Sequence, residues 1–349
     1  MTLFLTFASL FAAAIPMLFF LFVIWKWDLY DRKPIWLMGG AFLWGALGAV
    51  LLAIVGQVIL DPIVNSYFPE QSLALTVTFG APITEEPAKA LILILLIRSR
   101  KFGNICDGFV FGAAAGLGFG MTENAKYFME SAWATGEYAG GVAQWMQLVV
   151  TRTLFSAVMH AAATSMVGAA AGIGKFHSRI VRALFVGVGM GLAMAMHALW
   201  NGILVTDIRP GKDFLRLNEI FGMGGDIEPF LYSAFFFLIE LAIVLLMFGL
   251  CMIWENRKLK QSLEYEAEKG SIPKEHVAYL ASYFRRRELG WLEPQIPKDE
   301  YIRLATHLAQ RGRQARSLEG QRKKWYGLDY RRLQHEIADV LQTAPEKGK

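Results

Sequence analysis

The chain has 349 residues, of which 54% are hydrophobic and 19% charged, whereas soluble domains carry about 25% charged residues. Residues 255–349 hold 20 of the 35 Lys and Arg and 14 of the 30 Asp and Glu, a net of +6, so the first 254 residues net −1 (15 minus 16). This composition excludes an ordinary soluble domain. The basic end has no zinc-finger spacing or nucleic-acid motif, so it predicts an anionic lipid surface as neighbour and no nucleic-acid partner.

Seven apolar stretches are long enough to cross a bilayer, whose core needs about 20 helical residues. They lie at 3–25, 36–60, 73–97, 107–125, 148–173, 181–205 and 230–254. The first lacks a positive n-region and is long for a signal peptide, so it is interpreted as an uncleaved span. The predicted fold class is all-α: a polytopic membrane helix bundle of about seven spans (1–254), followed by a helical cytoplasmic tail (255–349).

The basic residues of the loops predict the orientation. Clusters follow spans one, three and five: Lys26, Arg32 and Lys33; Arg98, Arg100 and Lys101; Lys175, Arg179 and Arg182. The loop at 61–72 has no Lys or Arg. The positive-inside rule therefore predicts a multi-pass protein of the cell membrane with its N-terminus and the loops at 126–147 and 206–229 outside, and its tail in the cytoplasm.

Small residues recur at every fourth position in spans four, five and six, a pattern that lets helices approach closely in lipid. The stripes are Gly108, Gly112, Gly116 and Gly120; Ala157, Ala161, Ser165 and Ala169; and Ala183, Gly187, Gly191 and Ala195. We therefore expect these three spans to pack against one another.

Span three contains APITEEPAK, in which Glu85 and Glu86 are adjacent and Lys89 follows one turn later. Residues three and four apart on a helix are neighbours, so Lys89 can reach either carboxylate. Pro82 and Pro87 bracket the pair and should bend or open the helix, which is tolerated at membrane depth where backbone lines a watery cavity. A structural Glu–Lys pair needs one carboxylate only, so the second favours acid–base chemistry.

Polar residues of three further spans point to the same layer. Counted from the outer ends of the spans at 1.5 Å per residue, Glu85, His160 and His197 lie at depths of about 20, 18 and 12 Å, and Glu123 at about 3 Å. Arg152, near the outer end of span five, can pair with Glu123. Taken singly, each of these residues is also typical of a satisfied buried hydrogen bond. Their convergence predicts one site in the outer half of the bilayer.

Two other intramembrane polar residues, Gln57 in span two and Glu240 in span seven, have no partner recognisable in the sequence. We interpret both as structural.

Four motifs in this order resemble the PrsW family of intramembrane proteases, distant relatives of the type II CAAX-prenyl proteases. They are EExxK (Glu85, Glu86, Lys89), FGxxEN (Phe119, Gly120, Glu123, Asn124), His160 with Thr164, and HxxxN (His197, Asn201). The resemblance covers about residues 75–205. It implies a glutamate-dependent membrane protease acting on a membrane-anchored, anti-sigma-factor-like protein on the extracytoplasmic side. The CAAX group often has a histidine at the position of Glu123, so the chain departs from that pattern there.

Peptide hydrolysis needs a water, a base, an acid and donors for the oxyanion. Glu85 or Glu86 is the predicted base, and Lys89 would tune or orient the pair. His160 and His197 would polarise the carbonyl or bind the water.

Asn201 is the predicted oxyanion donor. A metal form of the site is equally open, because Glu123, His160 and His197 match a catalytic zinc set with a free water position, although the sequence HExxH is absent. The predicted cofactor is therefore none or one divalent metal, zinc.

Three other functions fit parts of the pattern. The carboxylates and histidines could form a proton or cation path in a transporter. The two histidines could ligate haem in a redox carrier, or the tail could be the working part of a membrane scaffold. Inverted repeats, which are typical of many transporters, are not recognisable in the sequence.

Overall fold

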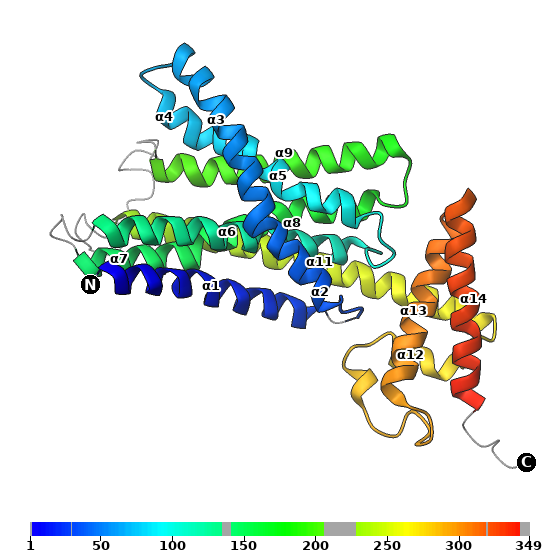
Figure 1. The fold of residues 1–349 in the computed structure, drawn as a ribbon. Coiled ribbons are helices and arrows are strands. Elements are labelled where there is room, and N and C mark those ends of the chain that lie inside the picture. Colours follow the sequence, from blue (N-terminus) through cyan, green and yellow to red (C-terminus); the bar gives the residue numbers. More distant parts are fainter. Residues whose placement is uncertain (1, 29, 135–140, 206–227, 319, 343–349) are drawn as a thin grey trace, which may run out of the picture. The chain divides into compact units, whose positions relative to one another are not determined.

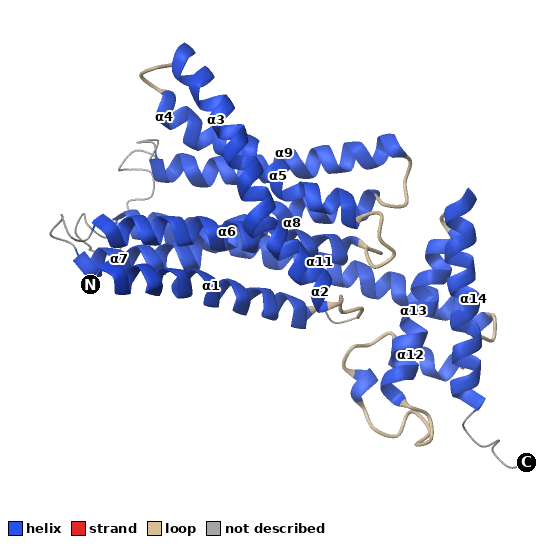
Figure 2. Ribbon diagram, in the orientation of Figure 1, coloured by secondary structure: helices blue, strands red, loops and turns tan. Residues whose placement is uncertain are grey.

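The computed structural model describes residues 2–28, 30–134, 141–205, 228–318 and 320–342, so most of the predicted outer loop at 206–229 lies outside the described residues. Every regular element in these ranges is a helix, as predicted, and Figure 2 shows no strand among them. The chain divides into two compact units. The first comprises Met1–Trp27, Lys33–Lys175 and Arg179–Phe248, and the second comprises Asp28–Arg32, Phe176–Ser178 and Gly249–Lys349.

Three helices of the first unit contain a π turn, in which one extra residue widens the helix. The elements are α1 (Thr2–Trp27); α2 (Ile35–Leu43), the π turn Trp44–Ala49 and α3 (Val50–Tyr67); α4 (Ser72–Leu75), the π turn Thr76–Gly80 and α5 (Ala81–Leu96); α6 (Ile105–Ala134); α7 (Gly141–Thr151), the π turn Arg152–Ser156 and α8 (Ala157–Gly174); α9 (Arg179–Val205); and the start of α11 (Glu228–Glu268). In Figure 1, α3 crosses obliquely over helices that run roughly alongside one another.

Six helical segments are long and apolar enough to cross a membrane by length and composition. They are Thr2–Trp27, Ile35–Tyr67, Ile105–Ala134, Gly141–Gly174, Arg179–Gly202 and Phe237–Glu268. Predicted span three is helical from Ser72 to Leu96, but Glu85, Glu86 and Lys89 interrupt its apolar run. Length and composition thus support six of the seven predicted spans, and the crossing by Ser72–Leu96 stays a prediction.

Helix α6 is the centre of the first unit and packs antiparallel against α8 through the predicted small residues. A Cβ atom at Gly112 would lie 2.8 Å from the Cα of Ser165, and one at Gly116 would lie 2.6 Å from the carbonyl carbon of His160. On another face of α6, a Cβ at Gly118 would lie 2.8 Å from the carbonyl carbon of Phe42 in α2. The close packing predicted for spans four and five is confirmed, and only glycine permits it at these positions.

The small-residue stripe predicted for span six is wrong by about half a helical turn. A Cβ at Gly187 or Gly191 would meet nothing within 4 Å, whereas one at Gly189 would lie 2.7 Å from the Cβ of Ala170 in α8. Ala193 and His197 continue the Gly189 face and are both buried. The ionisable His197 must turn away from lipid, so its face of α9 is the packed one.

The second unit is a small helical domain with its own apolar core. Its elements are the end of α11, α12 (Val277–Leu280), α13 (Lys298–Arg316) and α14 (Gly320–Gln342). Leu263, Leu280, Tyr301, Leu308 and Ile337 are fully buried in this core. The unit also contains residues 28–32 and 176–178, which connect α1 to α2 and α8 to α9.

Candidate active site

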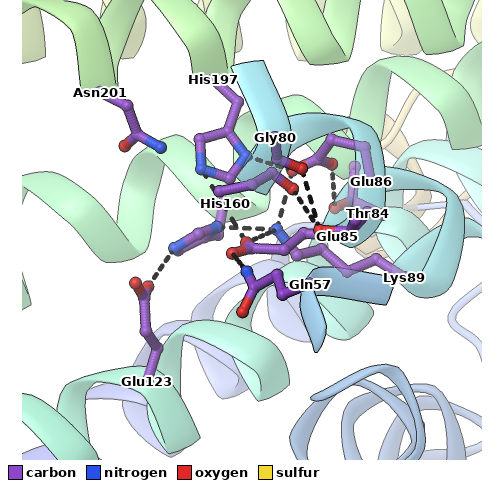
Figure 3. A network of polar contacts seen from close by, with 12 residues as sticks. Gln57, Gly80, Thr84, Glu85, Glu86, Lys89, Glu123, His160, His197 and Asn201 are labelled. Carbon is purple, nitrogen blue, oxygen red and sulfur yellow. Dashed lines mark hydrogen bonds and ion pairs between the residues drawn. The ribbon is translucent and has the colours of Figure 1, made fainter. Parts of the chain in front are cut away.

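The two adjacent glutamates and Lys89 form one buried ion cluster on α5. Lys89 Nζ lies 2.7 Å from Glu86 Oε1 and 3.3 Å from Glu85 Oε2, so the lysine reaches both carboxylates as the spacing predicted. Glu86 and Lys89 are fully buried, and Glu85 is 6% exposed. Charges taken out of water are stable only when paired and hydrogen-bonded. Figure 3 shows that side chains of neighbouring helices make polar contacts with this cluster.

His197 of α9 is held by Glu86 in one orientation. Its Nδ1 lies 2.8 Å from Glu86 Oε1, and Thr164 Oγ1 of α8 donates to Glu86 Oε2 at 3.3 Å. An ionised carboxylate only accepts hydrogen bonds, so we assign the proton of the neutral imidazole to Nδ1. The lone pair then lies on Nε2, which is 3.9 Å from Glu85 Oε2. That lone pair is free to accept a proton from water or to bind a cation.

His160 of α8 links Lys89 to Glu123. Its Nδ1 lies 2.9 Å from Lys89 Nζ, and its Nε2 lies 2.6 Å from Glu123 Oε2. An ammonium group only donates, so Nδ1 accepts and the imidazole proton is assigned to Nε2, facing Glu123. Arg152 NH2 lies 2.9 Å from the same Glu123 oxygen, which is the predicted Arg–Glu pair. His160 and Glu123 thus form a polar chain that leads away from the glutamate pair (Figure 3).

Glu123 lies deeper along its helix than we predicted. The span was expected to end at residue 125, but α6 continues to Ala134, which leaves eleven residues, or about 17 Å, after Glu123. Residues 126–134 contain no glycine or proline, and Lys126 pairs with Glu130 one turn on at 3.9 Å, so nothing stops the helix at 125. The shallow depth of about 3 Å was therefore an error in the helix end.

Asn201 is one turn from His197 on α9, but its contact is with a backbone group. Its Nδ2 donates to the carbonyl of Val77 at 2.9 Å, within the π turn that precedes α5. The widened turn and Pro82, which has no N–H, leave carbonyls of this segment without their usual α-helical partners. The predicted opening of the helix thus lies before the glutamate pair, and Asn201 ties α9 to it.

Gln57 of α3 was interpreted as structural, but it contacts the site. Its Nε2 lies 3.4 Å from Glu85 Oε1, which places a neutral donor on the carboxylate oxygen opposite Lys89. Nothing in the sequence signals this pair, because Gln57 and Glu85 belong to different spans and neither spacing nor charge links them. Figure 3 shows the amide directed at Glu85.

Gln57→Leu should weaken this support without removing the reactive groups. We expect cleavage activity to fall by up to about tenfold, the equivalent of one hydrogen bond of about 1.4 kcal/mol. The rate of substrate cleavage by purified protein would measure this, with Gln57→Glu as the comparison. Activity of Gln57→Leu equal to that of the unaltered protein would show that the contact is incidental.

The donor atoms of the cluster fit a divalent metal. One donor atom each from Glu85, His160 and His197 lies within 4.8 Å of the other two, and all three residues are buried. Two imidazoles and a carboxylate are a catalytic zinc set. The structure brings these two histidines together with Glu85, whereas the sequence pointed to Glu123 as the third ligand. With Glu85, Glu86 and Glu123 ionised and Lys89 and Arg152 charged, the cluster nets −1 (two minus three), so an added cation is electrostatically favourable.

The fold and this cluster define a polytopic helical membrane protein whose polar site lies inside its bundle. Residues 33–242 match the model of a family described as PrsW family intramembrane metalloprotease. The chain therefore belongs to the PrsW family.

A curated relative supports this assignment. Protease PrsW of Clostridioides difficile (strain 630) is 34% identical over 122 residues, which are 34% of this chain and 50% of the relative. The chain thus matches about half the length of that relative. No solved structure matches the chain.

Proposed function

We propose that this protein is an intramembrane endopeptidase that hydrolyses a peptide bond of a membrane-anchored protein. The observation that carries the proposal is the pairing of Glu85 with the Nε2 lone pair of His197, 3.9 Å apart. A carboxylate and an imidazole acceptor at this separation can hold one water between them. Membership of the PrsW family and the name of the curated relative support this reaction class.

In the proposed mechanism, Glu85 accepts the proton of the attacking water and His197 orients that water. Glu86 acts as a positioning residue, because it fixes the imidazole of His197 through Nδ1 at 2.8 Å and the ammonium of Lys89 at 2.7 Å. Lys89 also contacts Glu85 Oε2 at 3.3 Å and so holds the two carboxylates of the pair together.

The leaving amine needs a proton, and the oxyanion needs a donor. His160 carries its proton on Nε2 against Glu123, so the pair can deliver a proton to the amine. Asn201 has two amide hydrogens, of which one goes to Val77, so the other can donate to the oxyanion.

The family description names a metalloprotease, and Glu85, His160 and His197 would hold the ion in a metal form of the site, in which His160 Nδ1 would leave Lys89 while Nε2 kept its proton on Glu123. When bound, a zinc ion lowers the pKa of its water and polarises a carbonyl. The carboxylate of Glu85 has two oxygens, so it can contact a cation and still accept the proton of the water.

The topology belongs to the same proposal. Residues 1–254 would form the membrane protease domain of a cell-membrane protein, with residues 255–349 as a cytoplasmic tail, the N-terminus outside and the site in the outer half of the bilayer. The loop charges support this orientation. It is also supported by the second unit, which gathers two loops predicted to be cytoplasmic together with the tail. A single-span protein of anti-sigma-factor type is the expected substrate.

Cleavage and metal content test the proposal together. Purified protein reconstituted with a single-span substrate should release a shortened fragment and should carry about one zinc per chain. His197→Ala should lose both the metal and the cleavage. Full cleavage after complete metal removal would assign water activation to the glutamate and the histidines alone, and identical fragments from the variant and the unaltered protein would sink the protease assignment.

A further inference from the structure

A short turn of the second unit exposes two large apolar side chains with arginines between them. We define the Phe284 loop as residues 283–290, YFRRRELG. Phe284 is 81% and Leu289 95% exposed, the highest values among the large hydrophobic residues that the structure describes. Arg285 and Arg287 lie between them and are exposed as well. Leaving two such residues in water costs hydrophobic free energy, so they indicate a contact that covers them.

Buried contacts of Arg286 fix the base of the loop, so the exposure of its tip does not result from poor packing. Arg286, between the two exposed arginines, is buried, and it donates to the carbonyl of Leu280 and, at 3.0 Å, to Thr306 Oγ1. Burial lowers the pKa of this guanidinium to about 10, so it stays charged at pH 7. Just beyond the loop, Trp291 stacks on Tyr279 with ring centroids 5.0 Å apart.

A short connection limits how far the base of this loop can lie from the end of α1. The guanidinium of Arg286 lies 5.1 Å from the ring centroid of Tyr30. Tyr30 belongs to the connection between two membrane-spanning helices, three residues after α1 ends at Trp27 and five before α2 begins at Ile35. Three residues of extended chain span at most about 11 Å. The base of the Phe284 loop therefore lies within reach of the membrane surface at which α1 ends.

We propose that the Phe284 loop inserts Phe284 and Leu289 into an anionic lipid surface, with Arg285 and Arg287 on the lipid phosphates. Two apolar tips with exposed arginines between them match the acyl boundary and the headgroups of such a surface. The net charge of +6 over residues 255–349 adds to this complementarity. The loop lies outside the residues that match the family, 33–242, and the inference does not depend on the proposed cleavage reaction.

A fluorescent label tests the contact in the full-length protein. The thiols of Cys106 and Cys251 are buried, so Leu289→Cys can be labelled selectively with a polarity-sensitive dye. The protein is placed in nanodiscs of phosphatidylcholine, alone or mixed with phosphatidylglycerol, with a nitroxide on some headgroups. We expect the dye at position 289 to be quenched severalfold more than the same dye at Ser317→Cys, an exposed position that follows α13.

The quenching should depend on charge. Arg285→Gln combined with Arg287→Gln should reduce it in the anionic nanodiscs and leave the dye at position 317 unchanged. Equal quenching at positions 289 and 317 would overturn the proposal. So would a dye at position 289 that is already shielded in detergent without lipid, since a protein contact would then cover the loop.

Discussion

Glu85→Gln is expected to abolish cleavage while leaving the fold intact. The substitution keeps the size of the side chain and its contact with Gln57, but it removes the acceptor that faces His197 Nε2 at 3.9 Å. Loss of a general base costs about 10²- to 10⁴-fold in rate. The single-turnover rate of cleavage of a reconstituted substrate measures the effect, and the thermal midpoint of the purified protein checks folding.

Glu240→Gln is the matched control, because it makes the same change at another buried intramembrane glutamate. Glu240 of α11 is 6% exposed, and its Oε2 has no hydrogen-bond partner among the described residues. It makes none of the contacts of the site, so we expect cleavage within about twofold of that of the unaltered protein. Equal losses in both variants would indicate a general effect of replacing an intramembrane carboxyl group and would contradict the role of Glu85.

Gly116→Ala should also reduce cleavage, because the added methyl group displaces the backbone at His160. The added Cβ would lie 2.6 Å from the carbonyl carbon of His160 and 2.8 Å from the Cα of Ala161, and backbone cannot rotate away as a side chain can. The helices must separate, which costs about 1–3 kcal/mol in a packed core. A displacement of about 1 Å at His160 reduces the rate by about 10²-fold. Thermal unfolding and cleavage rate measure the two effects.

Gly187→Ala provides the comparison for the glycine prediction. A Cβ at Gly187 meets nothing within 4 Å, and alanine favours a helix by about 1 kcal/mol over glycine. We expect unchanged cleavage and equal or higher thermal stability. Similar losses in the Gly187 and Gly116 variants would refute the packing of α6 against α8 described above.

Local periodicity explains what the sequence could predict. The apolar runs placed six spans, and the three- and four-residue spacings linked Lys89 to both glutamates, because each of these inferences needs one helix only. How one helix packs against another was harder to predict. The phase of α9 could not be read from its small residues alone, since the longer stripe of small residues, through Gly187, lies off the packed face, and the buried His197 marks the packed face through Gly189.

The acid that joins His160 and His197 in the candidate metal site shows a second limit of prediction from the sequence. The depths counted from the sequence group Glu85 with the two histidines, whereas Glu123 is placed too near the outer surface because the end of α6 is predicted nine residues too early. Of the two histidines, Glu123 contacts only His160, whereas Glu85 lies with both. Gln57 was interpreted as structural for a related reason: an uncharged amide carries no partner signal until a structure places a carboxylate beside it.

The second unit also has a consequence for the order in which the protein is made. His307 of α13 lies 3.2 Å from Asp31 in the first connection between spans, a separation of 276 residues along the chain. A ribosome adding 5–20 residues per second takes roughly 14–55 s to cover that distance. The connection between α1 and α2 is therefore made long before α13, and it lacks its contact with His307 until α13 has been synthesised. Ribosome release of the C-terminal residues is thus the step at which the earliest-made loop acquires its final neighbours.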